Sequence, residues 1–123
     1  KMKVEFFNDK LIEAIGAGVY GIYLNNKKNL LYIGESEFVL VRCSAHLYEI
    51  QKGAGYFGFT NEISNNDFTL IFDLFDSIPN RKSRKQREKE LIQILCPKQQ
   101  SGISDRVKSV EEMMENLKKL LEE

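Results

Sequence analysis

The sequence predicts an α+β domain in which helices flank a small, antiparallel (mixed) three-stranded sheet, with an extra helix at the C-terminus. Two β-rich runs separated by a short polar turn indicate a hairpin, and one near-continuous hydrophobic run is typical of a central strand. Apolar residues spaced three and four apart towards the C-terminus indicate helices. The chain of 123 residues has the length of one domain, so we place a single domain over residues 1–123.

The first elements are a short helix and a hairpin. Residues 8–15 predict the helix, and Gly16 is suited to close it. The runs 18–24 and 30–34 have strand composition and flank the polar turn 25–29. This arrangement predicts two antiparallel strands.

The next segment, residues 37–52, combines strand-forming residues with helix signals. Ser36 is a suitable N-cap, Gly53 is a suitable stop, and the length suits a helix better than a strand. We therefore predict a helix over 37–52. The glycine- and aromatic-rich residues 53–60 that follow predict a loop, whose aromatic side chains we expect in the core, with base stacking as the alternative.

The second half of the chain contains one strand and two helices. Residues 68–75 predict a central strand that is covered on both faces. Ser83 begins a capping-box pattern that predicts a helix to about residue 95, and Pro97 follows its end. A second capping box predicts a final helix over about 109–122.

Composition and charge narrow the classes of function. Hydrophobic residues make up 42% and charged residues 29% of the chain, and no run has the roughly 18 apolar residues that a membrane span needs. The N-terminus lacks the layout of a secretion signal, so we expect a cytoplasmic protein with no membrane partner. The net charge is zero, which argues against non-specific coating of nucleic acid. The cation-rich stretch 81–87 still allows one phosphate-facing side.

Three polar side chains have the spacing of site residues. Arg42 and His46 stand four residues apart, so on a helix they project from one face. Glu88 precedes Leu91 and Leu95 by three and seven residues, which places it on the apolar face of its helix. A carboxylate on such a face needs a cation or a metal ion. Glu88 is therefore either a partner in a buried ion pair or a metal ligand.

Two tyrosines on the predicted hairpin complete the set. Taken alone, Tyr20 and Tyr32 are ordinary cross-strand packing residues. Residues 18–20 read Gly-Val-Tyr and, after eleven intervening residues, residues 32–34 read Tyr-Ile-Gly. These tripeptides resemble the two signature motifs of the GIY-YIG nuclease family. Tyr23, which ends a literal Gly-Ile-Tyr, is the alternative to Tyr20, but only eight residues separate it from Tyr32, which is short for this family.

Further residues match the family pattern downstream, in the same order as in the family. The resemblance covers residues 16–100 or so. The family carries a small residue two positions after the glycine of the second motif, an arginine eight after it, often a histidine twelve after it, and a glutamate about nine before a proline. The matching residues are Ser36, Arg42, His46 and Glu88, the last nine residues before Pro97. Two positions differ from the family pattern: Phe38 stands where an asparagine or aspartate is usual, and Gln100 where an asparagine is frequent.

The resemblance implies a GIY-YIG-like fold and a divalent-metal-dependent endonuclease that hydrolyses DNA phosphodiester bonds. It implies Glu88 as the protein ligand of Mg²⁺ or Mn²⁺ and Arg42 as the clamp on the scissile phosphate. Tyr20 is then the candidate general base, and Tyr32 orients the water or the phosphate. His46 either hydrogen-bonds a tyrosine or is itself the base.

Further residues are expected to contact DNA. The residues of this group are Gly34, Ser36, Arg81, Lys82, Arg84, Lys85 and Gln100. The basic members would meet the DNA backbone, and the alternative is that they form a solvated helix face. Phe38, Gln100 and the neutral charge motivate a second hypothesis, a catalytically weak DNA-binding module of the same fold.

The predicted C-terminal helix carries an apolar stripe. Its members are Val107, Val110, Met114, Leu117 and Leu121. The stripe spans about two heptads, which is too short for a stable coiled coil by itself. We expect it to pack on the domain, with a homodimer or a protein–protein adaptor surface as the alternative.

Overall fold

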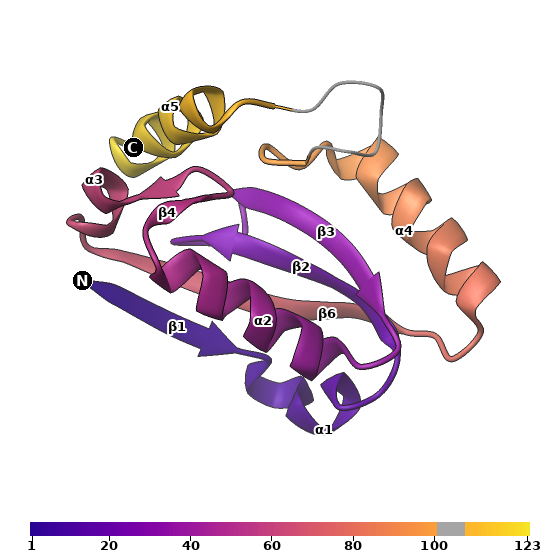
Figure 1. Cartoon of the computed structure of the whole chain (residues 1–123). Helices are drawn as coiled ribbons and strands as arrows, with labels where there is room; N and C mark the ends of the chain where they lie inside the picture. Colours follow the sequence, from indigo (N-terminus) through magenta and orange to yellow (C-terminus); the bar gives the residue numbers. More distant parts are fainter. Residues whose placement is uncertain (101–107) are drawn as a thin grey trace.

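The computed structural model describes residues 1–100 and 108–123 as an α+β fold built on a four-stranded mixed sheet (Figure 1). The strands lie in the order β1 (Met2–Phe6), β6 (Phe68–Ser77), β2 (Gly18–Leu24) and β3 (Leu30–Ser36). β1 runs parallel to β6, and the other neighbours are antiparallel. The predicted α+β class is confirmed, as are the hairpin and the central strand.

Helices cover both faces of the sheet. They are the short η1 (Asn8–Lys10), α1 (Leu11–Ala14) and α3 (Asn61–Ser64), and the longer α2 (Val39–Gln51), α4 (Arg81–Leu95) and α5 (Val110–Leu121). The core between α2 and the sheet contains residues of β2, β3 and β6, and a separate, smaller core lies under α4.

β1 is the strand that the sequence did not predict, so the expected three-stranded sheet was wrong by one strand. It is five residues long, and its middle residues Lys3, Val4 and Glu5 are exposed. Such a short edge strand with charged residues has little of the period-two hydrophobic pattern on which strand prediction depends. Its end is fixed by Phe6, whose ring packs edge-on against Phe72 at 5.1 Å.

The residues 53–60, which we expected to form a loop, form a second, two-stranded sheet instead. Its strands are β4 (Ala54–Tyr56) and β5 (Phe59–Thr60). Positive φ angles of 103° at Gly55 and 87° at Gly58 allow the tight reversal, and Phe57 also has a positive φ of 53°. At Gly58 an added Cβ would lie 2.6 Å from the Met113 carbonyl carbon, so α5 packs directly against this turn.

Two helices begin at other residues than predicted. α4 begins at Arg81 rather than at Ser83, because the Asn80 side chain accepts a hydrogen bond of 2.8 Å from the Ser83 amide and is the actual N-cap. α2 begins at Val39, and Ser36 accepts a bond from the Phe38 amide within a turn before the helix. The predicted capping by Ser109 at the start of α5 is confirmed.

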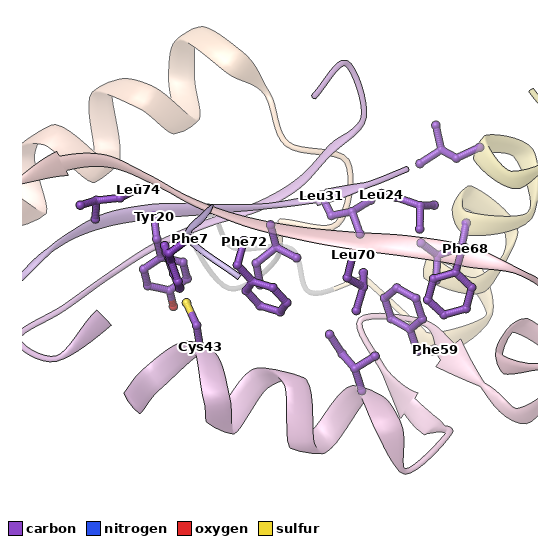
Figure 2. Packing of buried hydrophobic residues seen from close by; sticks show 14 of the residues in the cluster. Phe7, Tyr20, Leu24, Leu31, Cys43, Phe59, Phe68, Leu70, Phe72 and Leu74 are labelled. Carbon is purple, nitrogen blue, oxygen red and sulfur yellow. The ribbon is translucent and has the colours of Figure 1, made fainter. Parts of the chain in front are cut away.

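Strand alternation divides the β2 side chains between the two cores. Tyr20, Ile22 and Leu24 face α2, whereas Val19 and Tyr23 face α4. Figure 2 shows Tyr20 pointing from the sheet towards α2. The two candidate first tyrosines are thus on opposite faces of the sheet.

A bulge in β3 adjusts the neighbouring strand. Ile22 pairs with Tyr32, whereas the next residue, Tyr23, pairs with Leu30, so Leu31 is one extra residue. The bulge turns Leu30 to the α4 side, although Tyr32 lies on the α2 side.

α5 is joined to the sheet by the segment after α4. The Lys98 and Gln99 amides donate to the Leu30 and Leu31 carbonyls on the free edge of β3. The fully buried Gln99 amide group then donates to the carbonyls of Phe57 and Met113, at 2.9 and 2.7 Å, and its oxygen accepts from Asn116. Gln99 therefore connects β3 through its backbone amide with the β4–β5 turn and α5 through its side chain.

The apolar stripe of α5 packs on the chain itself, as expected. Leu117 and Leu120 are buried in the α2-side core, and Met114 and Leu121 pack against it. Val110 is exposed, and Val107 lies outside the described residues. This packing occupies the face on which the alternative of a homodimer rested.

We predict that Gln99→Leu lowers the free energy of unfolding by roughly 2–3 kcal/mol, because the buried carbonyls of Phe57 and Met113 lose their donor. Urea denaturation measures the change. Gln93→Leu makes the same substitution at an exposed position of α4 and should change stability by less than about 0.5 kcal/mol. Equal losses in the two variants would contradict the role of Gln99.

Candidate functional site

The site is built around Tyr20, whose side chain is 1% exposed. Tyr20 pairs across the sheet with Gly34, and a Cβ at Gly34 would lie 2.6 Å from Cζ of Tyr20 and 2.9 Å from Cε2 of Tyr32. A side chain at position 34 would therefore displace both rings. The structure gives Gly34, expected among the substrate contacts, a packing role.

A chain of hydrogen bonds leads from Tyr20 through His46 to Tyr56. The Tyr20 hydroxyl lies 2.7 Å from His46 Nε2, and the Tyr56 hydroxyl lies 2.7 Å from His46 Nδ1. His46 is 1% exposed and sits on the inward face of α2, whereas Tyr56 is half-buried on β4. Three separate elements thus contribute to one polar chain inside an apolar core.

Aromatic rings surround this chain. The ring of Tyr32 lies 6.3 Å from that of Tyr20 and 5.4 Å from the imidazole, between centroids. Phe57 packs on Tyr32 at 4.8 Å and on the imidazole at 5.5 Å. Tyr32 and Phe57 are half-buried, so they form the outer side of the cluster.

Arg42 and Glu88 bring opposite charges to this cluster. Arg42 is exposed on α2, one turn before His46. Burial raises the pKa of Tyr32, the Glu88 carboxylate raises it further, and the Arg42 guanidinium lowers it. Tyr32 therefore lies under the influence of a cation from α2 and an anion from α4.

The proton affinities of Tyr20 and His46 are set mainly by burial. Burial raises the pKa of Tyr20 far above its usual value, and the Arg42 guanidinium opposes this rise. Burial, followed by the charge of Arg42, lowers the pKa of His46 from 6.5 to about 4. At neutral pH both groups are uncharged, so His46 has one ring nitrogen free to accept a proton.

Glu88 is half-buried on α4. Burial raises its pKa, the nearby Glu35 raises it further, and Lys85 lowers it. Within residues 1–100 and 108–123, no cation lies within ion-pair distance of the Glu88 carboxylate. The predicted alternative of a direct ion pair is therefore not seen for Glu88 in this part of the chain.

The donor set fits a metal ion that needs few protein ligands. The described residues contain no cluster of three or more histidine, cysteine, aspartate or glutamate side chains that could enclose a metal. Glu88 offers a single carboxylate that is not ion-paired to any cation of the described residues, although the charge of Lys85 acts on it from further away. Mg²⁺ typically binds through one or two carboxylates, several waters and substrate phosphate, and this arrangement suits that mode.

Glu35 is the neighbour that keeps this part of the site charged. Its carboxylate lies 2.8 Å from Arg84 Nε and 2.9 Å from Lys85 Nζ. Partial burial disfavours the ionised form, but hydrogen bonds from Arg84 and Lys85 lower the pKa of Glu35 overall. Glu35 therefore remains a carboxylate, paired with the buried Arg84 and with the exposed Lys85.

Arg84, which we expected to contact the DNA backbone, is buried and bonded within the chain. Its side chain is 2% exposed, and besides binding Glu35 it donates to the carbonyls of Ile78 and Pro79 at 3.2 and 3.1 Å. Its guanidinium ties the start of α4 to β3. Arg81, Lys82 and Lys85 are exposed, as a phosphate-binding surface requires.

Gln100 also has a structural position. Its side-chain oxygen accepts from the Ile33 amide at 2.9 Å, and its nitrogen donates to the Ile33 carbonyl at 3.1 Å. The amide therefore pairs with the edge of β3 as an added strand residue would, between Tyr32 and Gly34. Gln100 was expected among the substrate contacts, but here its amide holds residues 32–34 in place. Its side chain, one methylene longer than that of asparagine, reaches both backbone groups of Ile33.

The predicted catalytic residues lie close to one another, whereas Tyr23 and Ser36 lie apart from them. The rings of Tyr20, Tyr32 and His46 lie together, the charge of Arg42 lowers the pKa of both tyrosines, and the charge of Glu88 raises the pKa of Tyr32. Tyr23 does not join them, because it packs against Phe75 on the α4 side. Ser36 bonds to the backbone of Phe38, which is 59% exposed.

Three residues of the site were missed by sequence reasoning. Tyr56 and Phe57 were expected only to pack or stack, and Glu35 was not singled out. Glu35 directly follows the second motif on the same strand, which could have drawn attention to it. No sequence signal linked Tyr56 to His46, because the contact depends on how the β4–β5 turn folds back on α2.

Comparisons of the chain with family models, with curated proteins and with solved structures found no match. No helix in the described part of the chain is long and apolar enough to cross a membrane.

We predict that stability falls as pH drops from 7 to 5. Between the ordinary pKa of histidine, 6.5, and the lowered pKa of His46, about 4, the unfolded chain binds a proton that the folded chain does not. The loss attributable to His46 is about 2 kcal/mol at pH 5 and is complete below pH 4. It is measured by urea denaturation as the difference in pH slope between the parent and His46→Gln. Identical slopes would contradict the lowered pKa.

Proposed function

We propose that the protein is a divalent-metal-dependent endonuclease of the GIY-YIG type, which hydrolyses DNA phosphodiester bonds. The observation that carries the proposal is the hydrogen bond between the Tyr20 hydroxyl and a neutral, buried His46, with Arg42 and Glu88 acting on the adjacent Tyr32. Aromatic rings that only pack in a core need neither a buried imidazole nor the nearby charges of Arg42 and Glu88. A site that deprotonates water beside a bound phosphate needs a proton acceptor, a cation for the phosphate and a ligand for the metal ion.

Tyr20 and His46 together overcome the weakness of a phenol as a base. A tyrosine with a raised pKa is a poor source of phenolate at neutral pH. If Tyr20 passes its proton to His46 Nε2 while it takes one from the attacking water, the phenol stays neutral and His46 becomes the imidazolium. A phosphate bound nearby brings negative charge, which favours the protonated imidazole.

Arg42 and Tyr32 form the substrate side of the site. Arg42 is exposed beside the cluster, where its guanidinium can hold the scissile phosphate through charge-assisted hydrogen bonds and offset the charge that grows in the transition state. Because Tyr20 is 1% exposed, the attacking water must approach along the half-exposed Tyr32, which is suited to orient it.

Glu88 is the residue that would hold Mg²⁺ or Mn²⁺. When bound, such an ion supplies polarisation of the phosphate and stabilisation of the leaving oxygen. Arg81 and Lys85 precede Glu88 by seven and three residues on α4, so they share its side of the helix. We assign Arg81 and Lys82 to DNA backbone contacts that give position without sequence preference, and Lys85 would join them on exchanging its Glu35 partner for a phosphate.

We predict that Tyr20→Phe slows plasmid nicking in Mg²⁺ or Mn²⁺ by roughly 10²–10⁴-fold, the usual contribution of a general base. Tyr23→Phe is the matched control, because this tyrosine lies on the opposite face of the sheet and should keep close to the parental rate. Gel assays of supercoiled plasmid measure both. Equal effects of the two substitutions would refute the assignment of Tyr20.

A second prediction concerns the metal. Glu88→Ala should abolish metal-dependent cleavage but retain DNA binding, because the basic side chains of α4 remain. Glu90→Ala, two residues further along α4, should cleave like the parent, since Glu90 is engaged by Arg87.

Nicking that persists in Glu88→Ala would overturn the metal assignment. A parent that binds DNA but cleaves no duplex, branched or single-stranded substrate would instead identify a DNA-binding module.

A further inference from the structure

We infer that Tyr56 is a positioning residue of this site: its hydroxyl accepts a hydrogen bond from His46 Nδ1–H and so holds the imidazole in the tautomer whose Nε2 lone pair faces Tyr20. The chemical purpose of this arrangement rests on the proposed function. The tautomer itself does not, because it follows from hydrogen-bond partners and burial.

Two arrangements of protons fit the two distances of 2.7 Å. In the first, Tyr20 donates to Nε2, and Nδ1–H donates to Tyr56. In the second, Tyr56 donates to Nδ1, and Nε2–H donates to Tyr20. A neutral imidazole has one donor and one acceptor nitrogen, so the two bonds cannot both be donated by tyrosines.

The burial of Tyr20 decides between them. Its side chain is 1% exposed, and within the described residues His46 Nε2 is the one acceptor at hydrogen-bond distance from its hydroxyl. In the second arrangement the Tyr20 proton would be buried without an acceptor, at a cost in free energy comparable to that of a lost hydrogen bond. Tyr56 is half-buried, so its own proton can reach solvent in the first arrangement.

Arg42 acts in the same direction. A guanidinium only donates hydrogen bonds, and it lies close enough to Tyr20 to lower the pKa of that phenol. Because the positive charge of Arg42 repels a proton, the Tyr20 hydroxyl is best oriented with its proton turned towards Nε2. The first arrangement satisfies all of these groups together.

The β4–β5 turn is built to deliver Tyr56 to this position. The left-handed conformation of Phe57 and the glycines on either side of it fold the turn over the site. Gln99 holds the Phe57 carbonyl, and the Phe57 ring packs on both Tyr56 and His46. The hydroxyl of Tyr56 is therefore fixed against Nδ1 by a turn that α5 supports from outside.

The bond from Nδ1–H to Tyr56 determines what the other imidazole nitrogen, Nε2, can do for Tyr20. With Nδ1 protonated and bonded to Tyr56, Nε2 presents its lone pair and can accept the Tyr20 proton. The opposite tautomer would present an N–H to Tyr20 and could accept nothing there. Tyr56 thus supplies the acceptor that Nδ1–H needs in the competent tautomer, and it does so without touching the substrate itself.

Nitrogen NMR tests this directly, since His46 is the single histidine of the chain. Long-range ¹H–¹⁵N correlation of the whole, metal-free protein at neutral pH distinguishes the protonated from the unprotonated ring nitrogen. We expect the parent to show protonated Nδ1 and unprotonated Nε2. Tyr56→Phe removes the acceptor of Nδ1–H. Because a buried N–H without an acceptor costs more free energy than a ring nitrogen lone pair without a donor, the tautomer ratio should shift towards Nε2–H by roughly fivefold to tenfold. Tyr48→Phe, an exposed tyrosine on the same helix, should leave the ratio unchanged.

A parent with protonated Nε2 overturns the inference, and so does a tautomer ratio that is the same in Tyr56→Phe and the parent. An amide spectrum of Tyr56→Phe that matches the parent away from the site shows that the variant is folded. If the protein cleaves no DNA, the proposed function fails but the NMR result still decides the role of Tyr56. If it cleaves DNA, Tyr56→Phe should lower kcat and leave KM close to the parental value.

Discussion

The buried hydroxyl of Tyr20 is the constraint on which the site depends. A phenol inside an apolar core needs a hydrogen-bond partner, and the partner is His46 on α2. That bond fixes the face of α2 that meets the sheet, because His46 and Cys43 are both turned inward on the same helix. It also requires a neighbour without a side chain across the strand, and Gly34 meets that requirement.

The free edge of β3 is the second place where polar groups determine the arrangement. Two consecutive glutamines cover it: Gln100 bonds to both backbone groups of Ile33, while Gln99 extends from the Leu31 carbonyl to the β4–β5 turn and to α5. The C-terminal helix consequently stabilises the turn that carries Tyr56. Parts of the chain that are far from the tyrosine motifs in sequence hold the site together.

Local patterns predicted much of the fold, and long-range contacts account for what they missed. The hairpin was predicted from its polar turn, the central strand from its near-continuous hydrophobic run, and the helix that carries Arg42 and His46 from its length and flanking residues. β1 was missed because an exposed edge strand lacks a regular hydrophobic period, and Asn80 displaced Ser83 as the cap of α4. The spacing of Arg42 and His46 predicted a shared face, but neither the burial of Arg84 nor the bond from Tyr56 to His46 leaves a local trace, because both depend on tertiary contacts.

We propose that Tyr20 and His46 act as one proton-transfer unit, and a double-mutant cycle on DNA cleavage tests that proposal most directly. The rates of metal-dependent plasmid nicking are measured for the parent, Tyr20→Phe, His46→Gln and the double variant. If the two residues act as a unit, the double variant loses no more activity than the worse single variant. Losses that multiply, so that the two substitutions act independently, would contradict the account, as would a parent that does not cleave DNA.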